Sequence, residues 1–387
     1  MRKATELIHA GERIGTGDTP SLTTPIYETS TFIFESAAAV ADYQSGKREG
    51  YLYSRYENPT VVGVERKLAA VEGAEASLLF SSGMAATSHA LLTLLKSGDE
   101  VVCSAAIYGG TYHLIDDLLS RLGITHRFVT LDELKTPAAV IGPKTRVVWF
   151  ESPINPTLRC VDVRAVAAAC RAAGVVSAID NTFAGPIIQP VLSMGVDLSM
   201  QSATKYLNGH SDVTGGVLSG SRALLAPIAK TRRLLGGVMD PQPAFALGRG
   251  MKTLPLRMAQ HNANGMAVAA RLEQHPKIAR VYYPGLPSHP DHDVAKRQMT
   301  GFGGMVTIDV KGGQDAAFRA FDRFKVIKRA ASLGGVESIC SLPTLTSHTG
   351  LSDAELEKAG VSRGMIRISI GLEDAADLIE DLEQALS

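Results

Sequence analysis

Residues 198–210 read LSMQSATKYLNGH, and they are the best starting point for understanding the chain. A short apolar run gives way to Ser202, Thr204 and Lys205, as at the carboxyl end of a buried strand. A lysine in that position can lose its charge by desolvation and become a nucleophilic amine that forms a Schiff base with an aldehyde. Ser202 and Thr204 could hold a phosphate beside it. A surface lysine next to turn-forming hydroxyl residues has the same pattern, so this stretch alone leaves both interpretations open.

Further short apolar runs precede this one along the chain. They lie at residues 77–80, 100–103, 145–150 and 175–179, with helical patterns between them. The runs are continuously apolar rather than alternating, which is typical of strands covered by helices on both faces. We therefore expect an α/β domain with a mostly parallel sheet. Ligands of such sheets bind at the carboxyl ends of the strands, where Lys205 is predicted to lie.

The residue pattern at each end of the chain differs from that of the middle. Residues 1–48 mix Gly, Ser, Thr and Pro with little periodicity and predict an arm that makes its contacts on another body. After about residue 245, the pattern predicts a separate, smaller α+β domain. Its expected elements are a long helix at 256–275, strands at 304–310 and 365–370, and a closing helix at 374–386. The predicted division is an arm at 1–48, a large domain at 49–245 and a C-terminal domain at 246–387.

Composition narrows the class of function. The 39 Lys and Arg residues balance the 39 Asp and Glu residues, so no basic excess indicates a nucleic-acid partner or an acidic membrane. The 4 cysteines lack metal-like spacing, which argues against a disulfide framework or a metal site and favours a reducing cytoplasm. No run approaches the roughly 18 apolar residues of a membrane helix, and the start lacks the apolar stretch of a signal peptide. We expect a cytoplasmic protein that acts on a small molecule.

Two further segments fit a site around Lys205. Asp180 ends the apolar run at 175–179, and a carboxylate there needs a cationic partner. The protonated pyridine nitrogen of pyridoxal 5′-phosphate (PLP) is such a partner, because an aspartate facing it keeps the ring an electron sink; otherwise Asp180 caps a turn. Gly83 lies where a strand turns into a helix, whose free N–H groups and dipole favour a phosphate, although a tight loop has the same pattern.

Other motif-like patterns predict no site. Ser202-Ala-Thr-Lys205 fits the S-x-x-K of β-lactamases, but the accompanying elements of that family are missing. The segment from His289 to His292 lies in a Pro-rich stretch and is interpreted as a solvated loop rather than a metal site. Gly46-Lys47 and the glycines at 301–304 lack the remainder of a nucleotide-binding motif.

Taken together, the segments resemble the Cys/Met-metabolism (trans-sulfuration) family of PLP-dependent enzymes. The most specific matches are SATKYLNGHSD at 202–212 and DNTF at 180–183. Further matches are YSRYENP at 53–59, SGM at 82–84, YGGT at 108–111, ESPINP at 151–156, SLGGVES at 332–338 and RISIGLED at 367–374. The resemblance covers nearly the whole chain. It implies the fold-type I PLP-dependent transferase-like fold, with a mostly parallel seven-stranded sheet in the large domain and a smaller α+β C-terminal domain.

The resemblance also implies a role for each matching residue. Lys205 would hold PLP covalently and then carry protons, Asp180 would pair with the ring nitrogen, and Tyr108 would stack on the ring and act as an acid or base. The phosphate would be bound by Gly83, Met84, Ser202 and Thr204, together with Tyr53 and Arg55 from a neighbouring subunit. Asn155 would bond the ring hydroxyl, and Arg367, Ser332 and Asn155 would bind the substrate. The family's pattern implies a homotetramer built from dimers with shared active sites.

Three positions bear on which member this is. Gly110 stands where methionine γ-lyases typically have a cysteine, Ala331 where many cystathionine γ-lyases have a glutamate, and Thr346-Ser-His348 replaces a more usual Met-Thr-His. We expect a carbon–sulfur lyase that eliminates at the β or γ carbon of cystathionine, homocysteine, methionine or cysteine and yields an oxo acid, ammonia and a thiol. The alternatives are a γ-replacement enzyme, of the cystathionine γ-synthase or O-acylhomoserine sulfhydrylase type, and an inactive PLP-binding homologue.

Overall fold

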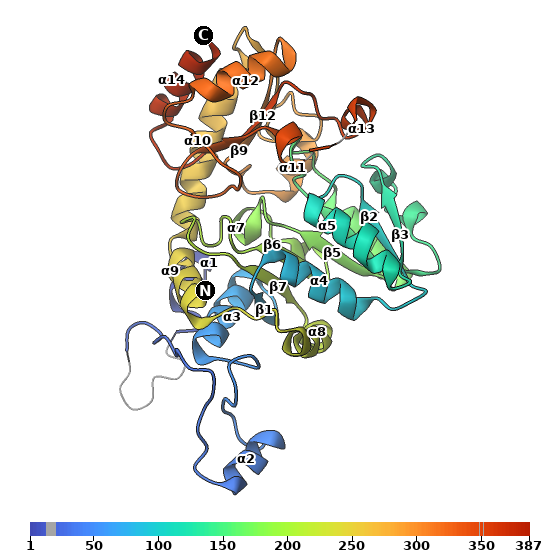
Figure 1. Cartoon of the computed structure of the whole chain (residues 1–387), viewed down its shortest axis with the longest axis vertical. Coiled ribbons are helices and arrows are strands. Elements are labelled where there is room, and N and C mark those ends of the chain that lie inside the picture. Colours follow the sequence, from blue (N-terminus) through green and yellow to red (C-terminus); the bar gives the residue numbers. More distant parts are fainter. Residues whose placement is uncertain (13–20, 348, 351) are drawn as a thin grey trace.

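The computed structural model contains two sheets, each in a layered body of its own (Figure 1). It describes residues 1–12, 21–347, 349–350 and 352–387. The larger sheet has the strand order β1-β7-β6-β5-β4-β2-β3. Its strands are β1 (Ala76–Phe80), β2 (Glu100–Ser104), β3 (Thr125–Val129), β4 (Thr145–Glu151), β5 (Val176–Asp180), β6 (Leu198–Ser202) and β7 (Gly216–Gly220). Of these, β7 runs antiparallel to both neighbours, β1 and β6, and the pairings among β2 to β6 are parallel, which confirms the predicted mostly parallel, seven-stranded sheet.

Helices cover both faces of this sheet, as the continuously apolar strands require. On one face, Phe80, Trp149 and Met200 pack under α4 (Gly83–Leu94) and α8 (Arg222–Leu235). On the other face, Leu79 and Val217 pack against α3 (Pro59–Glu72) and α9 (Pro241–Met251). Helix α6 (Val163–Ala173) covers that same face beside β4 and β5. The sheet is therefore buried on both sides, and its strand ends are where polar groups can meet a ligand.

The second sheet lies in the C-terminal body, as predicted. Its order is β10-β11-β12-β9-β8. Its strands are β8 (Ile278–Tyr282), β9 (Met305–Val310), β10 (Lys328–Arg329), β11 (Ile339–Ser341) and β12 (Met365–Ser369). The long helix α10 (Leu254–Glu273), α12 (Gly313–Arg323) and the closing helix α14 (Ala375–Leu386) pack on it. The two strands and two helices predicted for this region are all present, whereas β8, β10 and β11 were not predicted.

Shorter elements join these layers. The helices are α2 (Ala37–Gln44), α5 (Gly109–His113), α7 (Gly185–Ile188), α11 (His292–Gln298) and α13 (Asp353–Lys358). One π-helical turn, η1 (Leu114–Leu119), follows α5, and the 3₁₀ turns are η2 (Glu133–Lys135), η3 (Pro137–Val140), η4 (Val191–Met194) and η5 (Pro343–Leu345). Among the helices that the structure describes, none combines the length and the apolar character needed to cross a membrane.

The N-terminal segment has two different parts. Helix α1 (Lys3–His9), which was not predicted, packs on α3: Leu7 is fully buried, and Lys67 Nζ donates a 2.6 Å hydrogen bond to the carbonyl oxygen of Leu7. The segment that carries α2 instead extends away from both sheets (Figure 1). The boundaries at residues 48 and 245 stay predictions.

All four cysteines are buried and unpaired. They are Cys103, Cys160, Cys170 and Cys340. Burial raises the pKa of each thiol, to about 12 for Cys170 and Cys340. A buried thiol of this kind behaves as a small apolar side chain.

Candidate active site

The ends of β4, β5 and β6 meet residues of the C-terminal body around Lys205. Lys205 follows β6, and its Nζ donates a 2.7 Å hydrogen bond to Oγ of Ser332. The pKa of Lys205 is lowered to about 8. Burial is the main cause and the nearby charge of Arg367 the second, while the charge of Asp180 acts in the opposite direction. An amine with a pKa near 8 is partly unprotonated at neutral pH, which is what a nucleophile and proton carrier requires. The interpretation as an idle surface lysine is therefore not supported by its surroundings.

Arg367 on β12 provides the second positive charge. Its Nη1 donates to Asn155 Oδ1 at 2.9 Å, and its Nη2 donates to the carbonyl oxygen of Ser332 at 3.1 Å. The side chain is 9% exposed, its Nε is buried without a hydrogen-bond partner, and burial lowers its pKa to about 10. Among the described residues, no carboxylate lies within ion-pair distance of this guanidinium. A buried cation in this state is suited to an anionic ligand such as a substrate carboxylate.

Asp180, at the end of β5, is buried and has one oxygen engaged. Oδ1 accepts hydrogen bonds from the Thr182 backbone N–H at 3.0 Å and from the Thr182 hydroxyl at 2.5 Å. Burial raises the pKa of Asp180, against the two bonds from Thr182 and the charge of Lys205. Within the described part of the chain, its hydrogen bonds all fall on Oδ1. Oδ2 thus remains for a cationic partner, as predicted for a pyridinium nitrogen.

A close-packed glycine turn lies at the start of α4. Ser82 caps this 12-residue helix by accepting a hydrogen bond from the Ala85 N–H. A Cβ atom on Gly83 would lie 3.2 Å from Cβ of Ser202, and one on Gly216 would lie 2.1 Å from the carbonyl oxygen of Ser82. Only glycine at these positions lets the turn approach β6 and β7 so closely. The turn brings Gly83, Met84 and Ser202 to one helix N-terminus, which favours a phosphate.

Thr204 is engaged locally. Its hydroxyl accepts a 3.0 Å hydrogen bond from the Gly215 N–H and donates a 3.3 Å bond to the carbonyl oxygen of the same glycine. It ties the Lys205 turn to the start of β7, and a role in phosphate binding stays a prediction.

Glu151 was not predicted as a site residue, yet its carboxylate holds two turns of the site together. Its Oε2 accepts from the Tyr108 backbone N–H at 3.0 Å, and its Oε1 accepts from the Asn155 N–H at 3.2 Å. Its pKa is well above the usual range, because of burial first and then the charge of Asp180, with which it pairs in register. Glu151 thus fixes the turn carrying Tyr108, whose side chain is half exposed, against the turn carrying Asn155. The signal that could have identified it is the same as for Asp180, an acidic residue ending a buried strand.

Comparison with known proteins identifies the family. The family model described as "Cys/Met metabolism PLP-dependent enzyme" matches residues 4–387. The chain belongs to this family. Its relatives include a cystathionine γ-synthase of Mycobacterium bovis (43% identity, 99% of this chain and 96% of that protein) and a cystathionine β-lyase of Coxiella burnetii (42%, 99% and 97%). An L-methionine γ-lyase of Fusobacterium nucleatum is 41% identical over 99% of this chain and 97% of that protein. The solved structure of metB from Corynebacterium glutamicum superposes with a TM-score of 0.93 at 38% identity, covering 100% of this chain and 98% of that one.

The residues present fit the PLP that this family uses. A Cβ on Gly83 would crowd Ser202 at the N-terminus of α4, so the glycine leaves room for a phosphate at that point. Asp180 offers a buried carboxylate oxygen for the ring nitrogen, and Lys205 offers a partly unprotonated amine for the aldehyde. Arg367 keeps an unpartnered buried Nε for the carboxylate of an amino acid. The fold thus brings the charged groups that the cofactor and its substrate need to one place.

Tyr53 and Arg55 do not join this group in the single chain. Arg55 Nη1 donates to the carbonyl oxygen of Arg233, and its guanidinium lies 5.0 Å from the Tyr56 ring centroid. Tyr53 is 41% exposed. Among the described residues, neither side chain has a contact with the cluster around Lys205, so their predicted place at a neighbouring subunit's site stays a prediction.

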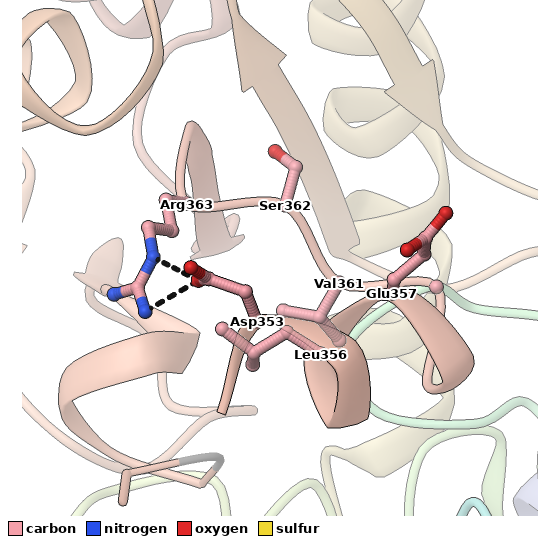
Figure 2. A pocket seen from close by; sticks show the side chains of 7 residues that line it. Asp353, Leu356, Glu357, Val361, Ser362 and Arg363 are labelled. Atoms are coloured by element: carbon pink, nitrogen blue, oxygen red, sulfur yellow. Dashed lines mark hydrogen bonds and ion pairs between the residues drawn. The ribbon is translucent and has the colours of Figure 1, made fainter. Parts of the chain in front are cut away.

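The open pocket in Figure 2 is a separate feature. It has a volume of about 360 Å³ and is lined by Asp353, Leu356, Glu357, Gly360, Val361, Ser362 and Arg363. Arg363 Nε donates to Asp353 Oδ1 at 2.8 Å across it (Figure 2). None of the predicted site residues lines this pocket, and an ion pair between two residues of its own lining occupies one side of it.

The prediction of a solvated loop from His289 to His292 is wrong. His289 is 3% and Asp291 is 8% exposed. Asp291 accepts two bonds from Arg159, through Nε at 2.5 Å and Nη2 at 3.2 Å, and one from the Cys160 N–H at 2.9 Å. These pairings make burial of the polar residues possible. Of the Thr346-Ser-His348 segment, His348 lies outside the described residues.

Proposed function

We propose that the chain is a PLP-dependent carbon–sulfur lyase, which cleaves a sulfur substituent from the β or γ carbon of an amino acid. The observation that supports this most directly is that Ser332 joins the two chemical groups required. Its hydroxyl contacts the amine of Lys205 and its carbonyl oxygen accepts from Arg367. A proton carrier and a carboxylate-binding cation are thereby held at a fixed spacing, so the α carbon of a bound amino acid would lie between them.

The proposed roles follow from the contacts. Arg367 and Asn155 bind the α-carboxylate, and Ser332 holds the Lys205 amine on the side of the α carbon. Lys205 removes the α-proton, for which an amine pKa of about 8 is suited. PLP, when bound, supplies the electron sink that stabilises negative charge at the α carbon, with Asp180 opposite its ring nitrogen. Tyr108 donates the proton that the departing sulfur takes up, and water releases the remaining carbon skeleton as an oxo acid and ammonia.

Elimination and replacement both begin with an amino acid bound through its carboxylate, for which Arg367 offers a free donor. Replacement needs a second substrate, a thiol compound, bound beside the first. Around Lys205, Arg367 is the cationic side chain with a free donor among the described residues, which is enough for one amino acid. γ-Replacement on an acylated homoserine is the second candidate, favoured by the identity to the Mycobacterium bovis cystathionine γ-synthase.

We also propose that the enzyme is a homotetramer built from dimers with shared active sites, located in the cytoplasm. The direction of Tyr53 and Arg55 away from their own chain's cluster supports sharing. The four unpaired cysteines suit a reducing compartment.

A substrate panel on the purified protein tests the proposal. Cystathionine, methionine, homocysteine, cysteine, and O-acetylhomoserine with a thiol are supplied in turn, and oxo acid, ammonia and thioether products are measured. Oxo acid and ammonia from a sulfur amino acid, absent in Lys205→Ala and retained in Lys230→Ala at an exposed lysine, support the lyase. A thioether from the acylated homoserine with little oxo acid supports replacement instead. No turnover with visible cofactor absorbance would indicate an inactive homologue.

A further inference from the structure

Arg257 is a buried cation without an acidic partner, outside the group of residues described above. It lies near the start of α10 and is 4% exposed. Among the described residues no carboxylate lies within ion-pair distance of it, and burial lowers its pKa to about 10. Burying such a charge is costly unless its donors are all satisfied. The position of this guanidinium therefore needs a physical explanation.

The explanation is in the acceptors that Arg257 bonds. Nη1 donates to the carbonyl oxygen of Tyr206 at 2.7 Å, and Nη2 donates to that of Leu207 at 3.2 Å. These are the two residues that follow Lys205 in the chain. Nη2 also donates to the Gly250 carbonyl oxygen at 2.9 Å, and Nε donates to Thr253 Oγ1 at 3.2 Å. One side chain of α10 thus links the Lys205 turn to the junction between α9 and α10.

The Lys205 turn has the unsatisfied carbonyl groups that such a cation can cap. Its internal bonds run from the Gly209 N–H to the Lys205 carbonyl oxygen at 2.8 Å and from the Asn208 N–H to that of Ala203 at 3.2 Å. The next carbonyl groups, those of Tyr206 and Leu207, have no turn of helix after them to supply donors. Arg257 supplies both donors.

Arg257 approaches the backbone of the Lys205 turn so closely that residue 209 must be a glycine. Gly209 has a φ angle of +76°, and a Cβ atom there would lie 2.0 Å from Nη1 of Arg257. One helical turn further along α10, the ring of His261 lies edge-on to the Tyr206 ring, with centroids 5.0 Å apart. The hydroxyl oxygen of Tyr206 accepts a 3.2 Å bond from the Gly304 N–H. The residue next to Lys205 is therefore held at its carbonyl group and at its ring.

We propose that Arg257 is a positioning residue for Lys205: it fixes the backbone of residues 206–207 and thereby the direction in which the amine reaches Ser332. The inference rests on the proposed role of Lys205 as the reactive amine. The hydrogen bonds of Arg257 go to Tyr206, Leu207, Gly250 and Thr253, and none of those that the structure describes goes to Arg367 or Gly83. We therefore expect any effect of Arg257 on the reaction to come through the position of Lys205.

The test compares Arg257→Met and Arg257→Lys with a matched control, Lys67→Met, in the PLP-loaded enzyme. Lys67 is also a buried cation that donates to the carbonyl oxygens of two consecutive residues of α1, Leu7 at 2.6 Å and Ile8 at 3.4 Å, away from the Lys205 turn. It differs from Arg257 in having an acidic partner, Glu12, at 3.1 Å. We expect Arg257→Met to lower kcat about 10- to 100-fold with a smaller change in KM, since small misplacements of a reacting group have effects of this size. Arg257→Lys, which keeps the charge and one donor, should recover part of kcat.

Two further readouts separate positioning from stability. The first is the pH titration of the visible absorbance of the bound cofactor, which should shift in Arg257→Met and stay unchanged in Lys67→Met. The second is the thermal midpoint, which both Met variants should lower. A loss of thermal stability in Arg257→Met with an unaltered kcat and an unaltered titration would refute the inference. The absorbance titration reports on Lys205 even when no substrate of the panel turns over. If only the proposed function fails, the unmodified protein shows no turnover but its titration still differs from that of Arg257→Met.

Discussion

Lys205 Nζ and Ser332 Oγ form a 2.7 Å hydrogen bond across 127 residues of sequence, between the turn after β6 and the loop before β11. Ser332 adopts a φ angle of +117°, which is unusual for a residue with a side chain. In this conformation its hydroxyl faces the lysine while its carbonyl oxygen accepts from Arg367. A positive φ angle at a residue other than glycine is often found at active sites and ligand-binding positions.

Ser332→Ala should separate these two functions. The substitution removes the hydrogen bond to Lys205 but leaves the carbonyl oxygen that accepts from Arg367. We expect kcat to fall about 10-fold, because a hydrogen bond to a charged amine is worth about 1.5–3 kcal/mol, while KM changes less. Steady-state kinetics on the best substrate of the panel provide the measurement, with Ser288→Ala at an exposed serine as the control. Equal changes in kcat and KM for Ser332→Ala would contradict the separation.

Arg367→Lys should act mainly on binding. In Arg367, two guanidinium nitrogens bond Asn155 and the Ser332 carbonyl group, and the third, Nε, is without a partner. A lysine keeps the positive charge but lacks this planar arrangement of donors. We expect KM to rise about 10- to 100-fold, in line with the loss of charge-assisted hydrogen bonds to a carboxylate. Arg319→Lys, at an exposed arginine of the same body, is the control. An unchanged KM would show that the carboxylate binds elsewhere.

Gly110→Ala should displace the Tyr108 ring. A Cβ atom at residue 110 would lie 2.7 Å from Cε1 of Tyr108 and 2.9 Å from Sδ of Met84. Both are closer than van der Waals contact, so we expect kcat/KM to fall about 10-fold and the ratio between β- and γ-substituted substrates to change. The neighbouring Gly109→Ala is the control, because the nearest atom to its added Cβ is the Ser347 carbonyl oxygen at 3.6 Å. If both variants behave alike, the ring does not limit the reaction.

Glu72→Gln should make stability less dependent on pH. Glu72, at the end of α3, is buried and accepts hydrogen bonds from Ser199 and Gln201, and burial raises its pKa to about 7. Between its unfolded value near 4.5 and about 7, the folded protein binds more protons than the unfolded chain, so this carboxyl group makes stability fall as pH rises through that window. The free energy of unfolding of Glu72→Gln relative to the unmodified protein should therefore increase by about 1–3 kcal/mol from pH 5 to pH 8. Urea unfolding at both pH values measures it, and a constant difference would mean that Glu72 does not titrate in this range.

The sequence predicted those parts of the fold whose signal is local. Continuously apolar runs predicted β1, β2, β4, β5 and β6, whereas β3 was missed because THRFV is half polar at the sheet edge, and β7 was missed because GVLSG begins and ends with glycine. The burial of His289 and Asp291 was missed because it depends on Arg159, 132 residues away from Asp291.

The site shows the same limit. Lys205, Asp180 and the phosphate-binding candidates Gly83, Ser202 and Thr204 could be proposed from their positions at strand ends. Ser332 and Arg367 came from the family resemblance, because only the folded chain brings them to β6. Glu151 and Arg257 act on backbone groups of other residues. Glu151 could have been noticed as an acidic residue that ends a buried strand, but the contacts of both residues follow from the geometry of two turns meeting, which no pattern along the chain encodes.

The burial of Cys103, Cys160, Cys170 and Cys340 has a consequence for the proposed release of thiols. Mixed disulfides form when an accessible thiolate attacks a disulfide sulfur. These four side chains are buried, and burial also raises their pKa values and so keeps them in the uncharged thiol form. Product thiols that oxidise in the surrounding solution would thus find no exposed cysteine thiol on the described surface with which they could form a disulfide. The proposed lyase would therefore release thiols without forming mixed disulfides on its own cysteines.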